Sequence, residues 1–242
     1  FGTILTHLFG GSAGREGTAV QVGGAIADRF TKILKLSKRD RQILLIAGIS
    51  AGFASVFGTP LAGGIFALEV LTLGRIRLDA IIPSFLAAIL ADYFCTIWNV
   101  QHTYYTITTV AEMNPINLLW ALLSGIIFGL VAMVFSKSTH WWTNLFSRYI
   151  KYPPLRPAVG GVILASVIFS LGTTRYIGLG LPVIVDAFKF ELNSYDFLAK
   201  ILFTSFTLGA GFKGGEVTPL FFIGATLGNI LIWIIPLPMS LL

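Results

Sequence analysis

Glu16 is the most informative residue of this chain, because it stands where a glycine-rich turn opens a helix, in the run Gly11-Ser-Ala-Gly-Arg-Glu-Gly-Thr-Ala-Val-Gln21. The unpaired N–H groups and positive dipole of a helix start can bind an anion. A carboxylate there can compete with that anion, and removal from water would favour its protonated form. The structural alternative is that Glu16 pairs with Arg15 or caps its own helix.

A second glycine-rich run, Gly209-Ala-Gly-Phe-Lys-Gly-Gly-Glu-Val-Thr-Pro219, precedes another apolar helix. Proline suits the first helical turn, and Glu216 and Thr218 flank the free amides. Glu216 either stabilises the dipole or takes part in transport, and Thr218 either donates its hydroxyl to an anion or caps the helix. Lys213 either raises the local positive potential or is a lysine that snorkels from a helix end. Two such starts, one in each half, indicate a transporter site at the midplane of a membrane.

Two other chemistries are open. Gly10-Gly-Ser-Ala-Gly14 fits the G-x-S-x-G pattern of a nucleophilic serine, so a serine hydrolase at Ser12 is an alternative that requires a base. The candidate bases for Ser12 are the three histidines, His7, His102 and His140.

Glu69 is the second of these chemistries. It would take a proton from the inner solution or would pair with Arg75 or Arg77.

The composition requires lipid around the elements that carry these residues. Hydrophobic residues make up 55% of the 242 residues and charged residues 12%, where soluble domains have about a quarter charged. The mean hydropathy is +0.82. We therefore expect an all-α polytopic integral membrane protein with a single transmembrane domain, residues 1–242. The net charge of +6 comes without a basic stripe, which excludes nucleic-acid binding, and the lone Cys95 is expected to fill the core.

The apolar segments differ in length, and this predicts half-membrane helices. A full crossing needs about 20 residues, which two segments reach, whereas others stop near 15. Several helices should therefore end inside the membrane. The segments are Ile43–Phe57, Leu61–Gly74, Ala80–Trp98, Ile116–Phe135, Ala158–Gly172, Phe197–Gly211 and Val217–Ile235.

Basic residues orient the first half of the chain. Those between Lys32 and Arg41, and then Arg75 and Arg77, put both ends of the Ile43–Gly74 stretch on the inner face. The stretch must enter and return, and Gly58-Thr-Pro60 at its midpoint predicts a re-entrant helical hairpin. The helix from Gly17 to about Thr31 then rises from the inner face, and Glu16 lies near the midplane.

The remaining loops continue this pattern. Ala80–Trp98 crosses outward to a loop, Asn99–Asn114, that has no lysine or arginine. Ile116–Phe135 returns to a loop that is expected to carry Lys137, Arg148, Lys151 and Arg156. Aromatic residues near these ends are predicted interfacial anchors: Tyr104, Tyr105, Trp141 and Trp142.

These residues resemble the CLC family of chloride channels and anion/proton antiporters. Gly14-Arg-Glu-Gly-Thr18 with Val20-Gln21 is similar to its G-[KR]-E-G-P motif, and Ala51–Gly63 with the helix to Glu69 is similar to its next two helices. The resemblance implies that Glu16 is the external gate and proton carrier. It further implies an anion path beside Arg15, Gly17 and Thr18 and beside Glu216, Val217 and Thr218.

Departures from the family pattern favour fluoride. Gly215-Glu-Val-Thr-Pro219 stands where most members carry G-x-F-x-P and is similar to the bacterial fluoride/proton antiporter branch. Fluoride is strongly hydrated, so a dry site must replace its water with backbone N–H and hydroxyl donors such as Thr218. Val70 aligns with the chloride antiporters' internal proton glutamate, which leaves Glu69 as a possible internal proton path.

The resemblance carries further expectations. It implies a homodimer in a lipid bilayer, with fluoride or chloride and protons as partners and no cofactor. It implies a multi-pass protein of the bacterial inner (plasma) membrane, with an inverted repeat of helices in about 1–98 and about 115–242. The chain is expected to be a fragment that lacks N- and C-terminal helices. Fluoride/proton antiport is the predicted activity, and a chloride/proton antiporter or chloride channel is the alternative.

Overall fold

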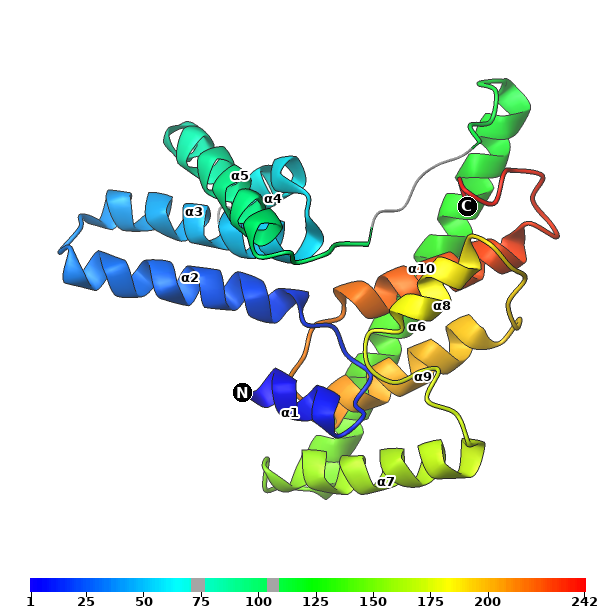
Figure 1. The fold of residues 1–242 in the computed structure, drawn as a ribbon. Helices are drawn as coiled ribbons and strands as arrows, with labels where there is room; N and C mark the ends of the chain where they lie inside the picture. Colours follow the sequence, from blue (N-terminus) through cyan, green and yellow to red (C-terminus); the bar gives the residue numbers. More distant parts are fainter. Residues whose placement is uncertain (71–76, 104–108) are drawn as a thin grey trace. The chain divides into compact units, whose positions relative to one another are not determined.

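The computed structural model describes residues 1–70, 77–103 and 109–242, and these residues fold into helices (Figure 1). Contacts divide the chain into two compact units. One unit comprises Glu16–Tyr104, and the other joins Phe1–Arg15 to Tyr105–Leu242. We call them the 16–104 unit and the two-segment unit. The predicted all-α class is confirmed.

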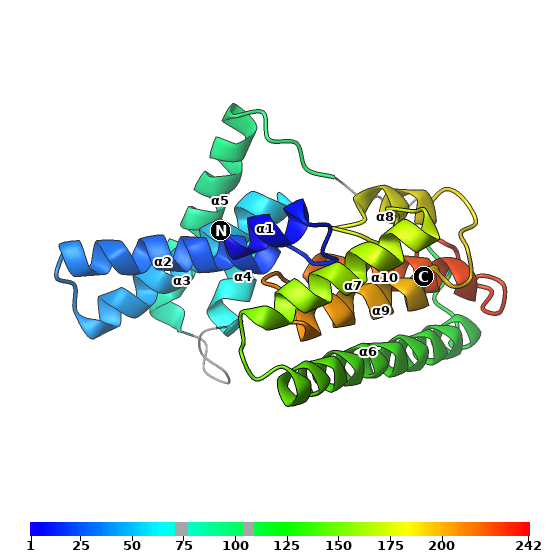
Figure 2. The same cartoon turned by 90° about the horizontal axis from the view of Figure 1, so that it is seen from below.

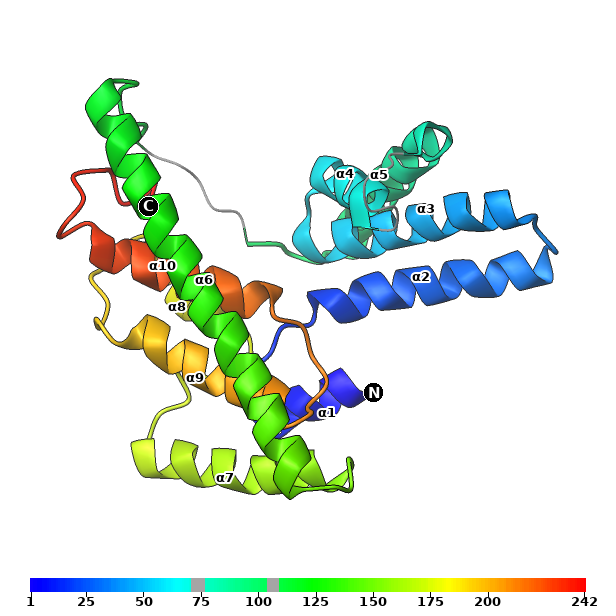
Figure 3. The ribbon, with the colours of Figure 1, turned by 180° about the vertical axis from the view of Figure 1, so that it is seen from behind.

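The 16–104 unit is built on a tight pair of long helices, α2 (Glu16–Ile33) and α3 (Lys38–Phe57), which run side by side in Figures 1 and 3. The two helices approach so closely that a side chain on Gly23 would overlap the Gly48 carbonyl. Glycine is therefore needed at this crossing, and small residues of this kind allow helices to pack in lipid. Asp28 and Arg41 join their ends through an ion pair of 2.6 Å.

The predicted hairpin is present in this unit. α3 ends at Phe57, and α4 (Pro60–Val70) begins after a turn that includes Gly58. α5 (Ile81–Ile97) follows the 3₁₀ turn η1 (Leu78–Ala80) and packs on both helices. Two buried serines link these elements, since Ser50 donates to the Ser84 carbonyl and Ser84 donates to the Gly64 carbonyl, at 2.8 and 2.9 Å.

In the two-segment unit, α9 (Asp196–Gly209) is central. It contacts α6 (Pro115–Tyr149), α7 (Leu155–Leu171) and α10 (Val217–Leu231), as Figure 2 shows from below. The core around it consists of Leu164, Tyr176, Val183, Ile184, Phe203 and Phe222. Two short helices complete this unit, α1 (Gly2–Leu8) and α8 (Leu181–Ala187), and the apolar pattern did not predict either of them.

α6 corrects the predicted loop after Phe135. The helix continues to Tyr149, so Lys137 and Arg148 lie on it, Lys151 lies in the following loop, and Arg156 lies in α7. The apolar run ends near Phe135, but the helix continues because its side chains still pack on α9. The Trp142 ring meets the Phe206 ring with centroids 4.9 Å apart.

The aromatic anchors therefore have different positions. Trp142 lies on α6 and packs against Phe206 of α9, whereas Trp141 is exposed. Tyr104 and Tyr105 lie outside the described residues.

The helices have the predicted mixture of long and short lengths, but three stretches within the described residues reach a full crossing where the apolar segments predicted two, because α3 begins at Lys38, before the apolar run. Three helical stretches of the described residues are long and apolar enough to cross a membrane: Lys38–Phe57, Leu78–Ile97 and Pro115–Tyr149. Shorter apolar helices accompany them, among them α4, α7 and α10. The most apolar window of α6 is only 11% buried, which leaves a surface for lipid or other protein.

Candidate functional site

The two glycine-rich runs are joined by a backbone pair. The Gly14 N–H donates to the Gly215 carbonyl at 2.6 Å, and the Gly215 N–H donates to the Gly14 carbonyl at 2.7 Å. A reciprocal exchange of this kind is the unit of an antiparallel ladder and has local two-fold symmetry. The approach needs glycine nearby, because a Cβ on Gly214 would lie 2.5 Å from the Ala13 Cβ.

The same backbone geometry precedes both members of the pair. We name Gly10–Gly14 the first glycine motif and Gly211–Gly215 the second, and their numbering differs by 201. Each begins with a left-handed glycine, with φ +76° at Gly10 and +90° at Gly211, which closes the preceding helix in a Schellman motif.

The hydrogen bonds of these closures correspond one to one. Gly10 donates to the His7 carbonyl and Gly11 to the Thr6 carbonyl, at 3.1 and 2.8 Å. At the second motif, Gly211 donates to the Leu208 carbonyl and Phe212 to the Thr207 carbonyl, at 3.0 and 3.3 Å. Every donor and acceptor is shifted by 201 residues, so the motifs are two copies of one backbone design.

A helix begins two residues after each paired glycine. α2 starts at Glu16 and α10 at Val217, so a carboxylate in one copy corresponds to an apolar side chain in the other. The first backbone amides of each helix have no partner within that helix. Each start therefore offers N–H donors and the positive end of a dipole to an anion.

Glu16 is buried without a complete set of partners. It is 5% exposed, and its Oε2 atom has no hydrogen-bond partner among the described residues. Arg15 is exposed, and none of the ion pairs in the described part of the chain joins it to Glu16. The structure thus contradicts the alternative that Glu16 pairs with Arg15. A buried carboxylate oxygen without a partner is costly, which is typical of a functional group.

The other predicted residues of the two helix starts differ in exposure. Thr218 is buried at 4%, and Gly17, Thr18 and Val217 are partly buried. Glu216 is exposed at the N-cap of α10, where its side chain makes no capping hydrogen bond. Its remaining structural role is its charge near the helix dipole.

Glu69 is exposed in the last turn of α4. The predicted alternative partner Arg77 is engaged elsewhere, because it donates to Asp79 at 2.8 Å and to Gln42. Arg75 lies outside the described residues.

Ser12 has the wrong partner for a nucleophile. It is fully buried, and its Oγ atom lies 2.8 Å from the Thr204 Oγ1 atom. The candidate bases are bound elsewhere: His7, His102 and His140 contact the backbone carbonyls of Thr3, Ser55 and Ser136. The geometry contradicts the serine hydrolase, because a nucleophile needs a base within hydrogen-bond reach.

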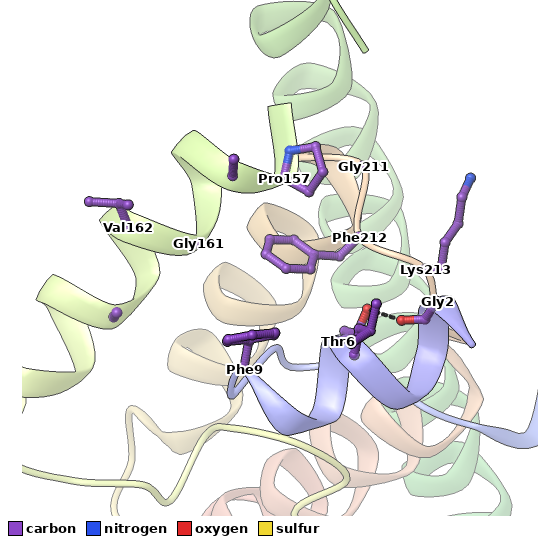
Figure 4. Close-up of a pocket in the computed structure, with 12 residues that line it drawn as sticks. Gly2, Thr6, Phe9, Pro157, Gly161, Val162, Gly211, Phe212 and Lys213 are labelled. Carbon is purple, nitrogen blue, oxygen red and sulfur yellow. Dashed lines mark hydrogen bonds between the residues drawn. The ribbon is translucent and has the colours of Figure 1, made fainter. Parts of the chain in front are cut away.

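A groove of about 570 Å³ lies beside the second motif, between α1, the start of α7 and residues 211–213. Figure 4 shows the Phe212 ring pointing toward α7 and the Lys213 side chain extending away from it. The lining is almost entirely apolar, and Phe9 and Val162 contribute to it. A small hydrated anion would lose its water there without replacement, so the groove is not the anion site.

Sequence reasoning missed a buried polar cluster in the same unit. Asp196 and Lys200 are both fully buried on α9, and Asp196 accepts hydrogen bonds from Arg175 and Tyr176 at 2.8 and 2.7 Å. The signal was available, since two opposite charges four residues apart interrupt an apolar helix. Thr204 and Thr207 continue the cluster along α9.

Comparison with known proteins agrees with this geometry. A protein of Pseudomonas syringae pv. tomato named "Chloride/fluoride channel protein" is 50% identical over all of this chain and 55% of its own length. An uncharacterized protein of Methanocaldococcus jannaschii is 30% identical over 91% of this chain and 56% of its own length. The chain therefore spans little more than half the length of the curated relatives it matches.

Solved structures share the fold. The crystal structure of a CLC-type fluoride/proton antiporter matches 99% of this chain and 61% of its own, with a TM-score of 0.91 and 39% identity. A slow cyanobacterial Cl⁻/H⁺ antiporter matches 98% of this chain and 59% of its own, with a TM-score of 0.78. Its 23% identity supports the fold alone.

The resemblance inferred from Gly14-Arg-Glu-Gly-Thr18 is thereby confirmed. The family of voltage gated chloride channels matches residues 1–240, nearly the whole chain. These proteins are integral membrane transporters and channels, not enzymes, and this chain belongs to the voltage gated chloride channel (CLC) family.

Proposed function

We propose that this chain is the core part of a fluoride/proton antiporter that exports fluoride. The observation that carries the proposal is the reciprocal Gly14–Gly215 pair, followed two residues later by Glu16 in one copy and by Val217 in the other. The fluoride assignment is supported by the Glu-Val-Thr-Pro sequence of the second start and by the names of two relatives.

Glu16 is the gate and proton carrier in this proposal. Its ionised carboxylate occupies an anion position at the start of α2, where helix amides favour negative charge. Protonation removes the charge, so the side chain can leave and fluoride can take its place. The unpartnered Oε2 atom supports this role, because it is the atom that can accept the proton.

The remaining predicted residues of the two starts are assigned to the anion path in this proposal. Arg15, Gly17 and Thr18 serve the first start, where Arg15 adds positive potential and the glycine exposes backbone amides. Val217 and Thr218 serve the second start, where the buried Thr218 hydroxyl donates a hydrogen bond to fluoride in place of water. Glu216 lies at the exposed end of this path, and Glu69 supplies protons from the inner face.

The assembly follows from the same proposal. The chain forms a single transmembrane domain, 1–242, whose inverted halves are about 1–98 and about 115–242. It acts as a homodimer and spans the bacterial inner membrane several times. Each subunit has its own pore.

The test uses the full-length protein, with any sequence that flanks this chain, in liposomes loaded with fluoride. We expect fluoride efflux coupled to proton uptake. Glu16→Gln should lower proton uptake by about tenfold or more, because an amide cannot take up and release the proton. Glu191→Gln, the same change at an exposed glutamate after α8, is the matched control and should keep the coupling.

The alternative transport function is chloride/proton antiport or a chloride channel, and the name of the Pseudomonas syringae relative, "Chloride/fluoride channel protein", favours it as the second candidate. Equal rates for chloride and fluoride would support this alternative over fluoride export. Anion efflux without proton movement in the unmodified protein would exclude any antiporter.

A further inference from the structure

A polar stripe runs along one face of α9. We call Asp196, Lys200, Thr204 and Thr207 the α9 stripe, and each of the four is fully buried. Their spacing of four, four and three residues places them on the same side of a helix. Buried polar side chains almost always have hydrogen-bond partners, so the partners of the stripe show which part of the fold it holds.

The first half of the stripe holds the segment that precedes α8. Asp196 binds Arg175 and Tyr176, as described above. The Lys200 Nζ atom donates to the carbonyls of Tyr176 and Gly178, at 3.1 and 2.8 Å, and lies 5.0 Å from the centre of the Phe222 ring. The backbone from Arg175 to Gly178 is therefore fixed to α9 by charged groups.

That segment in turn holds the first glycine motif. The Gly178 N–H donates to the Gly11 carbonyl at 3.0 Å. The second half of the stripe holds the next residue directly, because Thr207 Oγ1 accepts from the Ser12 N–H at 3.2 Å and Thr204 Oγ1 contacts Ser12 Oγ at 2.8 Å. Gly11 and Ser12 are thus both held by the stripe on α9, Gly11 through Gly178 and Ser12 directly.

The second glycine motif differs at the residue that the stripe contacts. Thr6 and Thr207 correspond by the shift of 201, and both hydroxyls donate to the carbonyl four residues earlier in their own helix, at 3.1 and 2.7 Å. Ser12, which the stripe contacts, is fully buried, whereas its counterpart Lys213 is exposed. The buried contact between the stripe and Ser12 therefore belongs to the copy that precedes Glu16.

We propose that the α9 stripe is a positioning element, in which Thr204 and Lys200 hold the first glycine motif in the geometry that sets anion affinity at the start of the Glu16 helix. This inference rests on the proposed function, since it assigns a role in anion binding. The stripe residues act through the loop and do not touch the anion themselves.

The test separates anion affinity from turnover. In the full-length protein in liposomes, Thr204→Val keeps the shape of the side chain and removes the hydroxyl. Loss of a buried hydrogen bond should raise the KM for fluoride by about fivefold with a smaller change in kcat. Thr204→Ser restores the hydroxyl and should restore the KM.

Thr226→Val is the matched control. Thr226 is also fully buried, but its hydroxyl donates to the Phe222 carbonyl within α10. Each valine variant removes one buried threonine hydroxyl, so a general loss of stability would affect both. A KM shift in Thr204→Val no greater than in Thr226→Val, or no rescue by Thr204→Ser, overturns the proposal.

A double-mutant cycle keeps the test valid where one variant folds poorly. Ser12→Ala should raise the KM as Thr204→Val does, and the double variant should show less than the sum, since the hydroxyls contact one another. Additive effects contradict the role. Lys200→Met should raise the KM further, and Lys200→Arg should recover part of the loss because it keeps the charge.

The failure of this inference differs from the failure of the proposed function. If the unmodified protein transports fluoride and Thr204→Val behaves as Thr226→Val, only the positioning role falls. If the unmodified protein moves no fluoride, the proposed function falls and the role in fluoride affinity falls with it.

Discussion

The first and second glycine motifs have one backbone design and different chemistry. Both close a helix with a left-handed glycine, make the same two closing hydrogen bonds and meet at the Gly14–Gly215 pair. After the pair, one continues into Arg15-Glu16 and the other into Glu216-Val217. The backbone geometry is repeated, but the first helical residue is a carboxylate only in α2, where it is Glu16, and is Val217 in α10. Under the proposed function this difference makes Glu16 the gate.

The largest expected effect comes from breaking the pair that joins the copies. Gly214→Ala places a Cβ 2.5 Å from the Ala13 Cβ, so the backbones beside Gly14 and Gly215 must separate. We expect the free energy of unfolding to fall by about 1–3 kcal/mol. Fluoride efflux should be nearly abolished. Thermal unfolding in detergent and liposome efflux measure the two effects.

Gly224→Ala is the control for this change. It lies inside α10, where an added Cβ meets nothing within 4 Å, and alanine should favour the helix by up to about 1 kcal/mol. Unimpaired transport in Gly214→Ala would mean that the close pairing is not required.

A smaller effect should follow from making the second copy resemble the first. Val217→Glu places a carboxylate at the helix position that corresponds to Glu16. At neutral pH the added charge should compete with fluoride and lower efflux by about tenfold, because the α10 start attracts anions. As pH falls the carboxyl is protonated and loses its charge, so efflux should recover relative to Val217→Gln.

Val217→Gln is matched in size and carries no charge at any pH. The ratio of efflux between the two variants is therefore the quantity to follow from pH 7 to pH 4. A ratio that stays constant over this range would contradict an anion position at the second helix start.

The elements that the sequence predicted well are those with local signals. The helix expected from Gly17 to about Thr31 is α2, Glu16–Ile33, and the turn at Gly58-Thr-Pro60 separates α3 from α4. Glycine and proline act on their own neighbours, so their effect is visible without the fold. The same holds for the glycine-rich helix starts.

The features that escaped prediction depend on distant partners. The sequence predicted a transporter site from the two glycine-rich starts, but it did not predict the hydrogen bonds between Gly14 and Gly215, which 200 intervening residues separate. The continuation of α6 beyond Phe135 is accompanied by the packing of Trp142 against Phe206, a contact that the apolar pattern does not reveal. The α9 stripe required knowledge that Lys200 meets the Tyr176 and Gly178 carbonyls, which only the fold brings near it.

The smallest effect should come from Lys213, which occupies in the second motif the place that buried Ser12 has in the first. Lys213 is exposed, so its charge can attract anions only through solvent. Lys213→Gln should slow fluoride efflux by about twofold at low ionic strength, and the difference should vanish in about 0.3 M gluconate salt, where the charge is screened. Lys189→Gln, at an exposed lysine after α8, should change efflux less at low salt. An effect of Lys213→Gln that persists at high salt would instead indicate direct contact with the anion, and the two copies would then both bind it through side chains.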